Sequence, residues 1–142
     1  MDDPEYLKFL NYYFKKNKEA KKNEIATKNI WIVKPGEFSN RGNGIIVCKK
    51  LEDIKAIVKQ KKKHENGHWK TYIVQEYIEK PMLYCRRKFD IRHYMLITFI
   101  NGHMKGYWYE TGYIRTTSFE YTTKNSFGSV HLTNDAIQKQ LP

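Results

Sequence analysis

The chain has 142 residues, and its 26 Lys and Arg against 15 Asp and Glu give a formal net charge of +11. This length suits one domain, and a hydrophobic content of 40% with 15% aromatic residues is too high for a disordered tail. No stretch approaches the roughly 20 apolar residues of a membrane span, and the N-terminus is not a signal peptide. Cys48 and Cys85 lack CxxC spacing and cannot form a disulfide framework. We therefore expect a soluble intracellular protein. The pI near 9.6 indicates an anionic partner, such as a nucleotide, a nucleic acid, a phospholipid head group or an acidic protein.

The first half of the sequence predicts a helix followed by short strands. Residues 4–22 repeat apolar side chains at spacings of three and four opposite a lysine-rich face, which is typical of an amphipathic helix. A strand is expected over residues 30–33, a Pro- and Gly-rich loop over 35–44 and a strand over 45–48. A short helix then begins within residues 51–53.

The second half predicts an antiparallel sheet. Four strands are expected over residues 71–77, 88–100, 103–109 and 112–117. The start of a helix is expected over residues 132–139. Asn101 and Gly102 separate two of these strands, and both residues tolerate the positive φ of a type I′ hairpin turn. The sequence therefore predicts a mixed α+β fold, mostly antiparallel, with flanking helices.

The pentapeptide HENGH, from His64 to His68, formally matches the zinc-protease pattern H-E-x-x-H. That chemistry needs both histidines on one face of a helix. Asn66 and Gly67 favour a turn, and no apolar helical stripe surrounds them. We therefore predict a solvated turn and no metal site.

Residues 39–44, SNRGNG, join two predicted strands. Glycines let backbone N–H groups approach phosphate oxygens, and Arg41 could add charge. The segment lacks both the Gly-Lys-Ser/Thr ending of a P-loop and the spaced glycines of a dinucleotide fingerprint, so taken alone it favours a hairpin turn. Lys34, which ends the preceding strand, either faces solvent or reaches a bound phosphate, and the sequence leaves both readings open.

Lys88, Asp90 and Arg92 alternate along a predicted strand, so their side chains share one face. A structural ladder of ion pairs is the alternative explanation, but such a ladder gains little when exposed and is demanding when buried. We therefore favour a polar site against the sheet.

Arg115 and residues 131–134 supply further polar groups. His131, Thr133 and Asn134 offer imidazole, hydroxyl and amide at a predicted helix N-terminus, where anions are favoured, although simple N-capping would also explain Thr133 or Asn134. The residues alone thus combine a glycine loop, two lysines, a carboxylate and two arginines. That set predicts a site for a nucleoside triphosphate and a carboxylate-bearing substrate.

Five segments, in this order and spacing, resemble the tubulin–tyrosine ligase family, and they are WIVKPGEFSNRGNGI, IVQEYIEKPMLY, RRKFDIRHYMLIT, GYIRT and HLTNDAIQK. The resemblance covers residues 29–139. It implies an ATP-grasp-like fold, incomplete at the C-terminal end, with a basic helix and linker over residues 1–28 and a partial ligase domain over 29–142.

The family resemblance implies an ATP-dependent ligase in which ATP phosphorylates a tubulin carboxylate and an amine attacks the acyl phosphate. Arg92 and Arg115 would be catalytic, holding the γ-phosphate or the substrate carboxylate. The implied nucleotide-binding positions are Lys34, Arg41, Gly42, Asn43, Gly44, Gln75, Glu76, Tyr77, Ile78, Lys88, Asp90, His131, Thr133 and Asn134. Gln75 to Ile78 would form the hinge beside adenine.

The sequence also departs from the family pattern. Glu76 stands where the family often carries Lys or Arg, and Asp135-Ala136 replace the Tyr-Ser of polyglutamylases, so glutamate-chain specificity is not supported. The Mg²⁺ ligands of the family are expected beyond the end of this chain, so we expect a truncated form that is weakly active or inactive alone.

The partners implied are ATP, a free amino acid and the acidic C-terminal tails of tubulin, with no membrane, in the cytoplasm on microtubules or in cilia. The alternative is a catalytically dead module that keeps affinity for tubulin or nucleotide. Nucleic-acid binding is not favoured, because Trp31, Trp108 and the strand tyrosines are expected in the core.

Overall fold

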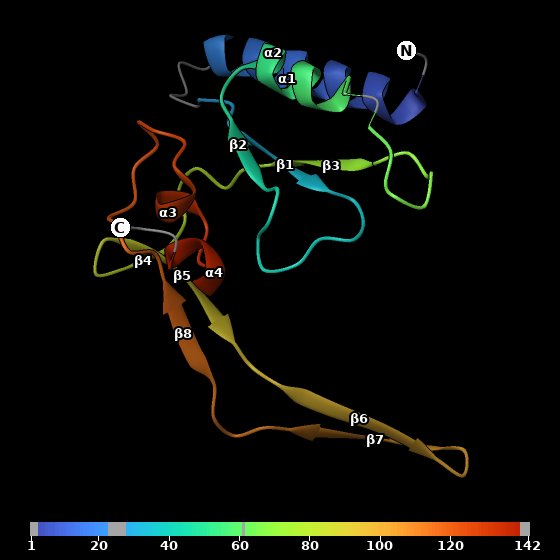
Figure 1. Cartoon of the computed structure of the whole chain (residues 1–142). Coiled ribbons are helices and arrows are strands. Elements are labelled where there is room, and N and C mark those ends of the chain that lie inside the picture. The colour runs from blue at the N-terminus through green and yellow to red at the C-terminus, as the bar shows by residue number, and fades with distance from the viewer. Residues whose placement is uncertain (1–2, 23–27, 61, 140–142) are drawn as a thin grey trace.

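A computed structural model of the chain describes residues 3–22, 28–60 and 62–139. Two helices lie on one face of a small sheet, a second small sheet with two short helices lies below it, and a two-stranded ribbon projects from the second sheet (Figure 1). The upper layer consists of α1 (Pro4–Lys22), β1 (Trp31–Pro35), β2 (Ile46–Cys48), α2 (Leu51–Val58) and β3 (Tyr72–Glu76). The lower part consists of β4 (Leu83–Tyr84), β5 (Arg87–Arg92), β8 (Tyr113–Thr116), α3 (Gly128–His131) and α4 (Asp135–Gln138), and the ribbon of β6 (Met95–Ile100) and β7 (His103–Trp108). All strand pairs are antiparallel, which confirms the predicted α+β class.

Helix α1 has the bounds that the sequence predicts. The Asp3 carboxylate accepts a hydrogen bond of 2.9 Å from the backbone N–H of Glu5, and Pro4 needs no partner in the first turn. Glu5 lies in the first turn and Lys21 and Lys22 in the last, where their charges complement the helix dipole.

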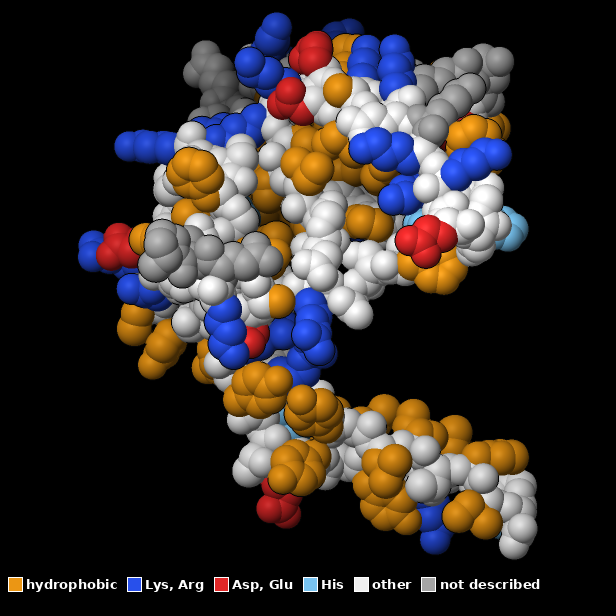
Figure 2. Space-filling model, in the orientation of Figure 1, with side chains coloured by type: hydrophobic (Ala, Val, Ile, Leu, Met, Phe, Trp, Pro, Cys, Tyr) orange, Lys and Arg blue, Asp and Glu red, His pale blue; other side chains and the backbone are white. Residues whose placement is uncertain are grey.

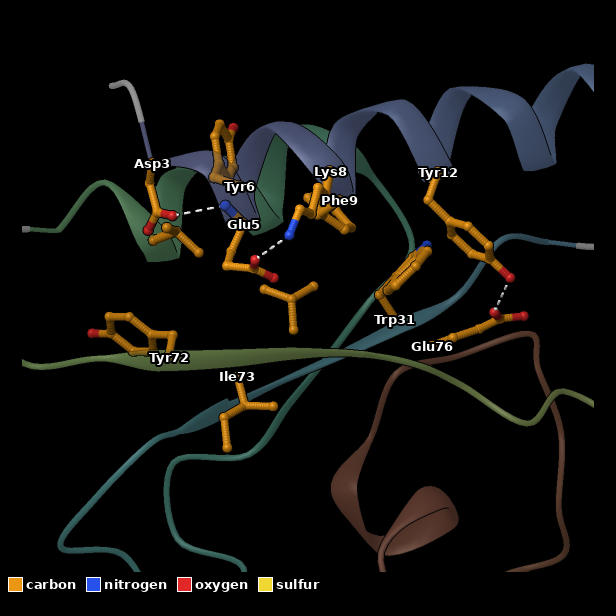
Figure 3. Close-up of a pocket in the computed structure, with 12 residues that line it drawn as sticks. Asp3, Glu5, Tyr6, Lys8, Phe9, Tyr12, Trp31, Tyr72, Ile73 and Glu76 are labelled. Carbon is orange, nitrogen blue, oxygen red and sulfur yellow. Dashed lines mark hydrogen bonds and ion pairs between the residues drawn. The ribbon is translucent and has the colours of Figure 1, made fainter.

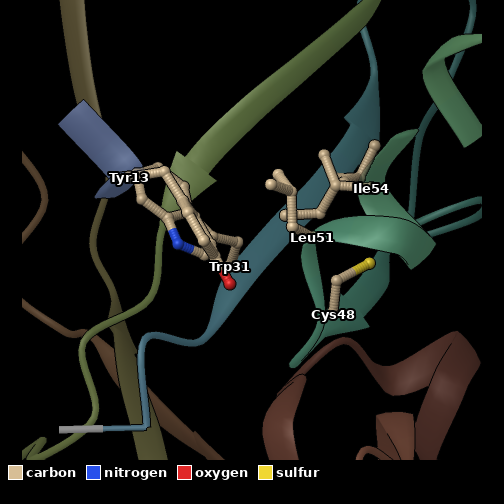
Figure 4. Close-up of a cluster of buried hydrophobic side chains, with 6 residues drawn as sticks. Tyr13, Trp31, Cys48, Leu51 and Ile54 are labelled. Atoms are coloured by element: carbon tan, nitrogen blue, oxygen red, sulfur yellow. The ribbon is translucent and has the colours of Figure 1, made fainter. Parts of the chain in front are cut away.

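The principal core lies between the two helices and the upper sheet (Figure 4). The Phe9 ring of α1 meets the edge of Trp31 with ring centres 4.9 Å apart. The strand order is β2-β1-β3, with Trp31 paired to Cys48 and to Glu76. The buried residues of this cluster are Tyr13, Trp31, Val33, Cys48, Leu51 and Ile54.

The lower sheet has the order β4-β5-β8, and the sequence prediction needs a correction there. The predicted strand over residues 88–100 is wrong as one strand, because the chain leaves β5 after Arg92 and starts β6 at Met95. The His93 ring stacks on Trp108 with centres 4.2 Å apart at the break. The sequence also missed β4 and α3, and the helix predicted over 132–139 is the shorter α4.

The ribbon ends in the predicted turn, where Asn101 has φ of 51° and Gly102 of 79°. The apolar side chains of the ribbon are exposed, and they form a hydrophobic surface along its length (Figure 2). The exposed apolar residues of β6 and β7 are Met95, Leu96, Ile97, Phe99, Ile100, Met104, Tyr107 and Trp108, so the expectation that Trp108 lies in the core is wrong. Among the described residues, no helix combines the length and apolar character that crossing a membrane requires.

Candidate nucleotide site

The face of the upper sheet opposite the helices is the roof of the candidate site. Side chains alternate along a strand, so Lys34 lies on the face opposite Trp31 and Val33, which pack under α1. Lys34 pairs with Ile73, and Ile32 pairs with Gln75, so these side chains share that face. The Lys34 ammonium makes no side-chain hydrogen bond or ion pair with any residue in the described part of the chain.

Hinge residue Glu76 points to the other side of the sheet. Its carboxylate accepts a hydrogen bond of 2.8 Å from the Tyr12 hydroxyl and forms an ion pair with Lys16, both on α1. The bond to Lys16 is the main reason that the pKa of Glu76 is lowered. The side chain of Glu76 therefore braces α1 and is not available to a ligand on the opposite face of the sheet.

The same carboxylate lines a cavity of about 590 Å³ between α1 and β3 (Figure 3). Aromatic side chains, among them Tyr6, Phe9 and Trp31, form much of its wall. The Glu5 carboxylate in the cavity is paired with Lys8. Glu76 is the one predicted site residue among those that line this cavity, so the cavity is separate from the cluster of predicted phosphate ligands.

The glycine loop forms a tight turn that faces the lower part of the molecule. Arg41, Gly42 and Gly44 have φ values of 54°, 86° and 75°, and the Asn43 N–H donates to the Asn40 carbonyl at 2.9 Å. A Cβ added to buried Gly42 would lie 2.9 Å from the side-chain amide of Asn134. Glycine is needed at this position both for its φ and for this close approach.

Asp90 and Arg115 form a two-point ion pair across β5 and β8. The Arg115 Nε donates to Asp90 Oδ1 at 3.0 Å, and Nη2 donates to Oδ2. Burial raises the pKa of Asp90, but hydrogen bonds from Arg115 and Thr133, with the charges of Arg115 and Arg92, outweigh it and leave the pKa below its ordinary value. Asp90 is therefore ionised at neutral pH, and the three other N–H groups of Arg115 are not used by this pair.

Three side chains from distant segments form a buried chain of hydrogen bonds. The Lys88 ammonium donates to the Tyr77 hydroxyl at 3.3 Å, and that hydroxyl lies 2.8 Å from His131 Nδ1. His131 Nε2 lies 2.9 Å from the Asn125 carbonyl, which can only accept, so Nε2 carries the proton and Nδ1 accepts from Tyr77.

Burial gives this chain of hydrogen bonds its charge state. It lowers the pKa of His131, which keeps the imidazole neutral, and raises the pKa of the Tyr77 hydroxyl. Burial also lowers the pKa of Lys88, partly opposed by the charge of Asp90. A half-buried ammonium that lacks full compensation gains more from a bound anion than an exposed one does.

Residues 131–134 connect these groups, and we name them the 131–134 segment. His131 bonds Tyr77, Thr133 lies close enough to Asp90 to lower the pKa of that carboxyl, and Asn134 packs against Gly42. The structure thus brings Tyr77, β5 and the glycine loop together around four consecutive residues, and β8 joins them through the pair of Arg115 with Asp90. Lys and Arg side chains gather at this waist of the molecule, beside the hollow under the upper layer (Figure 2).

Several predicted residues stay outside these contacts. Gln75 and Ile78 are exposed, as are Arg41 and Asn43 on the loop and Arg92 at the end of β5. Arg92 still lies near enough to lower the pKa of Asp90.

Sequence reasoning missed Lys49, which acts on the site, and Glu79, which holds the backbone just before β1. The charge of Lys49 helps to lower the pKa of His131, and Glu79 accepts hydrogen bonds from the backbone N–H groups of Lys28 at 2.8 Å and Ile30 at 3.2 Å. The alternation of side chains along β2 could have pointed to Lys49, because it lies two residues after buried Val47 and so on the same side of the strand. No sequence signal marks Glu79, because its partners lie far away in the chain.

The HENGH segment is the predicted turn. Residues 65–67 form the turn, Gly67 has φ of 83°, and the His64 N–H donates to the His68 carbonyl at 2.8 Å. Among the described residues, no group of three or more His, Cys, Asp or Glu side chains could hold a metal ion.

The fold is of the mixed α+β class, and its candidate site combines cationic side chains with a glycine-rich loop. Comparison with known proteins gives the family. The sequence model described as "Tubulin-tyrosine ligase family" matches residues 4–141, and the chain belongs to this family. Tubulin glycylase 3B of Drosophila melanogaster and tubulin monoglycylase TTLL3 of Homo sapiens are each 41% identical over 115 residues. These matches cover 81% and 80% of this chain but 14% of each relative, so the chain spans about one seventh of their length. Protein polyglycylase TTLL10 of Macaca fascicularis is 36% identical over 122 residues, or 80% of this chain and 19% of the relative.

Proposed function

We propose that this chain is the nucleotide-binding part of an ATP-dependent ligase that joins glycine to a carboxylate of tubulin. The observation that carries the proposal is the convergence of three predicted site segments, which contain Tyr77, Asp90 and Gly42, on the 131–134 segment. The names of the glycylase relatives support glycine as the amino acid and tubulin as the acceptor. An ATP-grasp-like arrangement, with the nucleotide between the upper sheet and the lower sheet, is part of the proposal.

The residues fit a triphosphate in three ways. Gly42, which has no Cβ, lets the backbone of the glycine loop pack directly on Asn134, beside the polar groups proposed to bind phosphate. Lys34 is an unpaired cation on the roof, and Lys88 is a half-buried ammonium that an anion would stabilise. We assign no metal ligand among the described residues.

The proposed reaction has two steps. A carboxylate oxygen of tubulin attacks the γ-phosphorus of ATP, the bond to the β-phosphate oxygen breaks, and ADP leaves. The glycine amine then attacks the carbonyl carbon of the acyl phosphate, phosphate leaves, and the amine loses a proton. Arg92 and the free N–H groups of Arg115 would stabilise negative charge on the transferred phosphoryl group.

Titration of a fluorescent ATP analogue tests the nucleotide site. We expect Lys34→Ala and Lys88→Ala to weaken binding by about tenfold each, because each removes a charge-assisted contact. Lys105→Ala on the ribbon is the matched control and should bind as the unmodified chain does. Absence of binding, or equal losses in all three variants, would overturn the nucleotide site.

Ligation with tubulin, ATP and one labelled amino acid at a time tests the reaction and its specificity. We expect glycine to be incorporated in preference to tyrosine and glutamate. Preference for another amino acid overturns the glycine assignment. Binding of ATP and tubulin without any product would favour a binding module over an enzyme.

A further inference from the structure

Glu37 connects the glycine loop to a distant hairpin. It follows β1 by two residues, and its Oε1 accepts hydrogen bonds from the Thr71 N–H at 3.1 Å and from His64 Nε2 at 2.9 Å. Its Oε2 accepts a hydrogen bond from the Thr71 hydroxyl. One carboxylate therefore uses both of its oxygens to join the start of the loop to residues 64 and 71.

The backbone repeats this connection one residue earlier. The Gly36 N–H donates to the Thr71 carbonyl at 3.0 Å. A Cβ on Gly36 would collide with Thr71 Oγ1, so glycine at residue 36 leaves room for the Thr71 hydroxyl that bonds Glu37. Residues 36 and 37 are thus held on the same partner, Thr71.

The hairpin that receives Glu37 is itself tied together. Lys63 and Trp69 form a β-bridge, and His64 and His68 are joined through their backbones at 2.8 Å. The hairpin leads directly into β3, the neighbour of β1 in the upper sheet. Glu37 therefore fixes the start of the loop to an element that is anchored in the sheet.

The loop needs such an anchor because its own backbone is unfavourable. Phe38, next to Glu37, has φ of 51°, a conformation that an aromatic residue rarely adopts. Its ring is 80% exposed and meets the His64 ring edge-on with centres 5.0 Å apart. Beyond it, the Ser39 hydroxyl donates to the Asn43 carbonyl at 2.7 Å, which closes the tip of the loop on itself.

We propose that Glu37 is a positioning residue that holds the glycine loop over the nucleotide by fastening it to His64 and Thr71. This proposal rests on the proposed nucleotide site and names the residue that sets the position of its loop. It also gives His64 a structural role in a segment whose sequence resembles a metal motif. Hydrogen bonds to the Thr71 hydroxyl, to His64 and to the Thr71 N–H lower the pKa of Glu37 to about 2, so the carboxylate is ionised throughout the neutral range.

Hydrogen exchange of residues 38–45, measured on the full chain without nucleotide, tests the clamp directly. We expect Glu37→Gln and Thr71→Val to raise exchange of these amides about tenfold or more, because each removes a hydrogen bond to a charged group. Amides of β1 and β3 should keep their exchange rates. Thr71→Ser, which keeps the hydroxyl, should restore slow exchange, and Glu65→Gln on the exposed turn of the same hairpin should change nothing.

Binding of the fluorescent ATP analogue, measured on the same variants, tests what the clamp does. We expect Glu37→Gln and Thr71→Val to weaken binding about fivefold to tenfold and Thr71→Ser to restore it. Unchanged exchange in residues 38–45 overturns the clamp whatever the nucleotide does. Faster exchange with no nucleotide bound by any variant or by the unmodified chain leaves Glu37 as the anchor of the loop and overturns the nucleotide site. Faster exchange with unaltered affinity overturns the positioning role.

Discussion

At the scale of single residues, buried and partly buried polar groups of this chain are bonded to residues far away in the sequence. Asp90 accepts hydrogen bonds from Arg115, and the Tyr77 hydroxyl accepts one from Lys88 and donates one to His131. Bonds of this kind cost free energy when one partner is removed, because the other is left buried without a partner. They also determine which charges remain available to an anion.

Asp90→Asn tests the ion pair through its pH dependence. Because the pKa of Asp90 is lowered in the folded state, the pair stabilises the chain above the pKa of an unfolded aspartate, near 4, and this stabilisation is lost as the pH falls through the folded pKa. We expect the variant to lose about 1–2 kcal/mol of unfolding free energy at pH 7. Denaturant unfolding between pH 7 and pH 2 should show the two proteins converging at the acid end, and Glu110→Gln should follow the unmodified chain throughout. A difference that stays constant with pH would contradict the ionised pair.

Gly42→Ala and Gly102→Ala separate backbone conformation from crowding. Both glycines have positive φ, 86° and 79°, but an added Cβ meets Asn134 only at Gly42 and meets nothing within 4 Å at Gly102. We expect each variant to lose about 1 kcal/mol for its backbone. Only Gly42→Ala should also weaken ATP-analogue binding, because the loop must shift. Equal nucleotide affinity in the two variants would contradict the close packing of Gly42 on Asn134.

At the scale of elements, the upper sheet and the ribbon differ in how they are supported. The upper sheet is covered by α1 and α2 and has Val33 at 1% exposure. The ribbon has two strands, and Phe99 in it is 73% exposed. A two-stranded hairpin is marginally stable by itself, so the ribbon depends on its local pairing and turn.

Phe99→Lys and Val33→Ala test this difference. We expect Phe99→Lys to change the unfolding free energy by no more than about 0.5 kcal/mol and to lower the fluorescence of a bound hydrophobic dye. Val33→Ala should cost about 2 kcal/mol, because it leaves a cavity in the core. Denaturant unfolding and dye titration measure both effects. A large loss of stability from Phe99→Lys would show that the ribbon face is packed.

At the scale of the whole molecule, the chain has a net charge of +11. Lys and Arg side chains gather between the upper layer and the ribbon, beside a hollow in the surface (Figure 2). Such a surface attracts anionic partners over a distance set by the Debye length, about 10 Å at 0.1 M salt. The proposed acceptor, an acidic tail of tubulin, has the complementary charge.

Microtubule co-sedimentation at rising salt tests this attraction. We expect the bound fraction to fall severalfold as NaCl rises from about 50 to 300 mM, because screening weakens the attraction of exposed charges. Microtubules from which the acidic tails have been removed are the control and should bind weakly at all salt concentrations. Binding that ignores both salt and the tails would contradict an electrostatic contact with them.

Local patterns predicted much of the fold. The spacing of apolar residues predicted α1 with its bounds, and Asn101-Gly102 predicted the ribbon turn. The alternation from Lys88 to Ile100 continues through the break at His93, so it could not reveal that β5 and β6 belong to different sheets. Stacking of His93 on Trp108 accompanies that break, and it is a contact between residues that only the folded chain brings together.

The sequence by itself determined the α+β class, the family motifs and most of the polar residues of the candidate site, because periodicity, turn chemistry and charge are local properties. Only the tertiary structure decided which of these residues meet. It turned Glu76 towards α1, buried His131 on Tyr77 and placed Asn134 against Gly42. The physical reason is that hydrogen bonds and close packing depend on distances of a few ångströms between segments that lie far apart along the chain, and no local pattern carries that information.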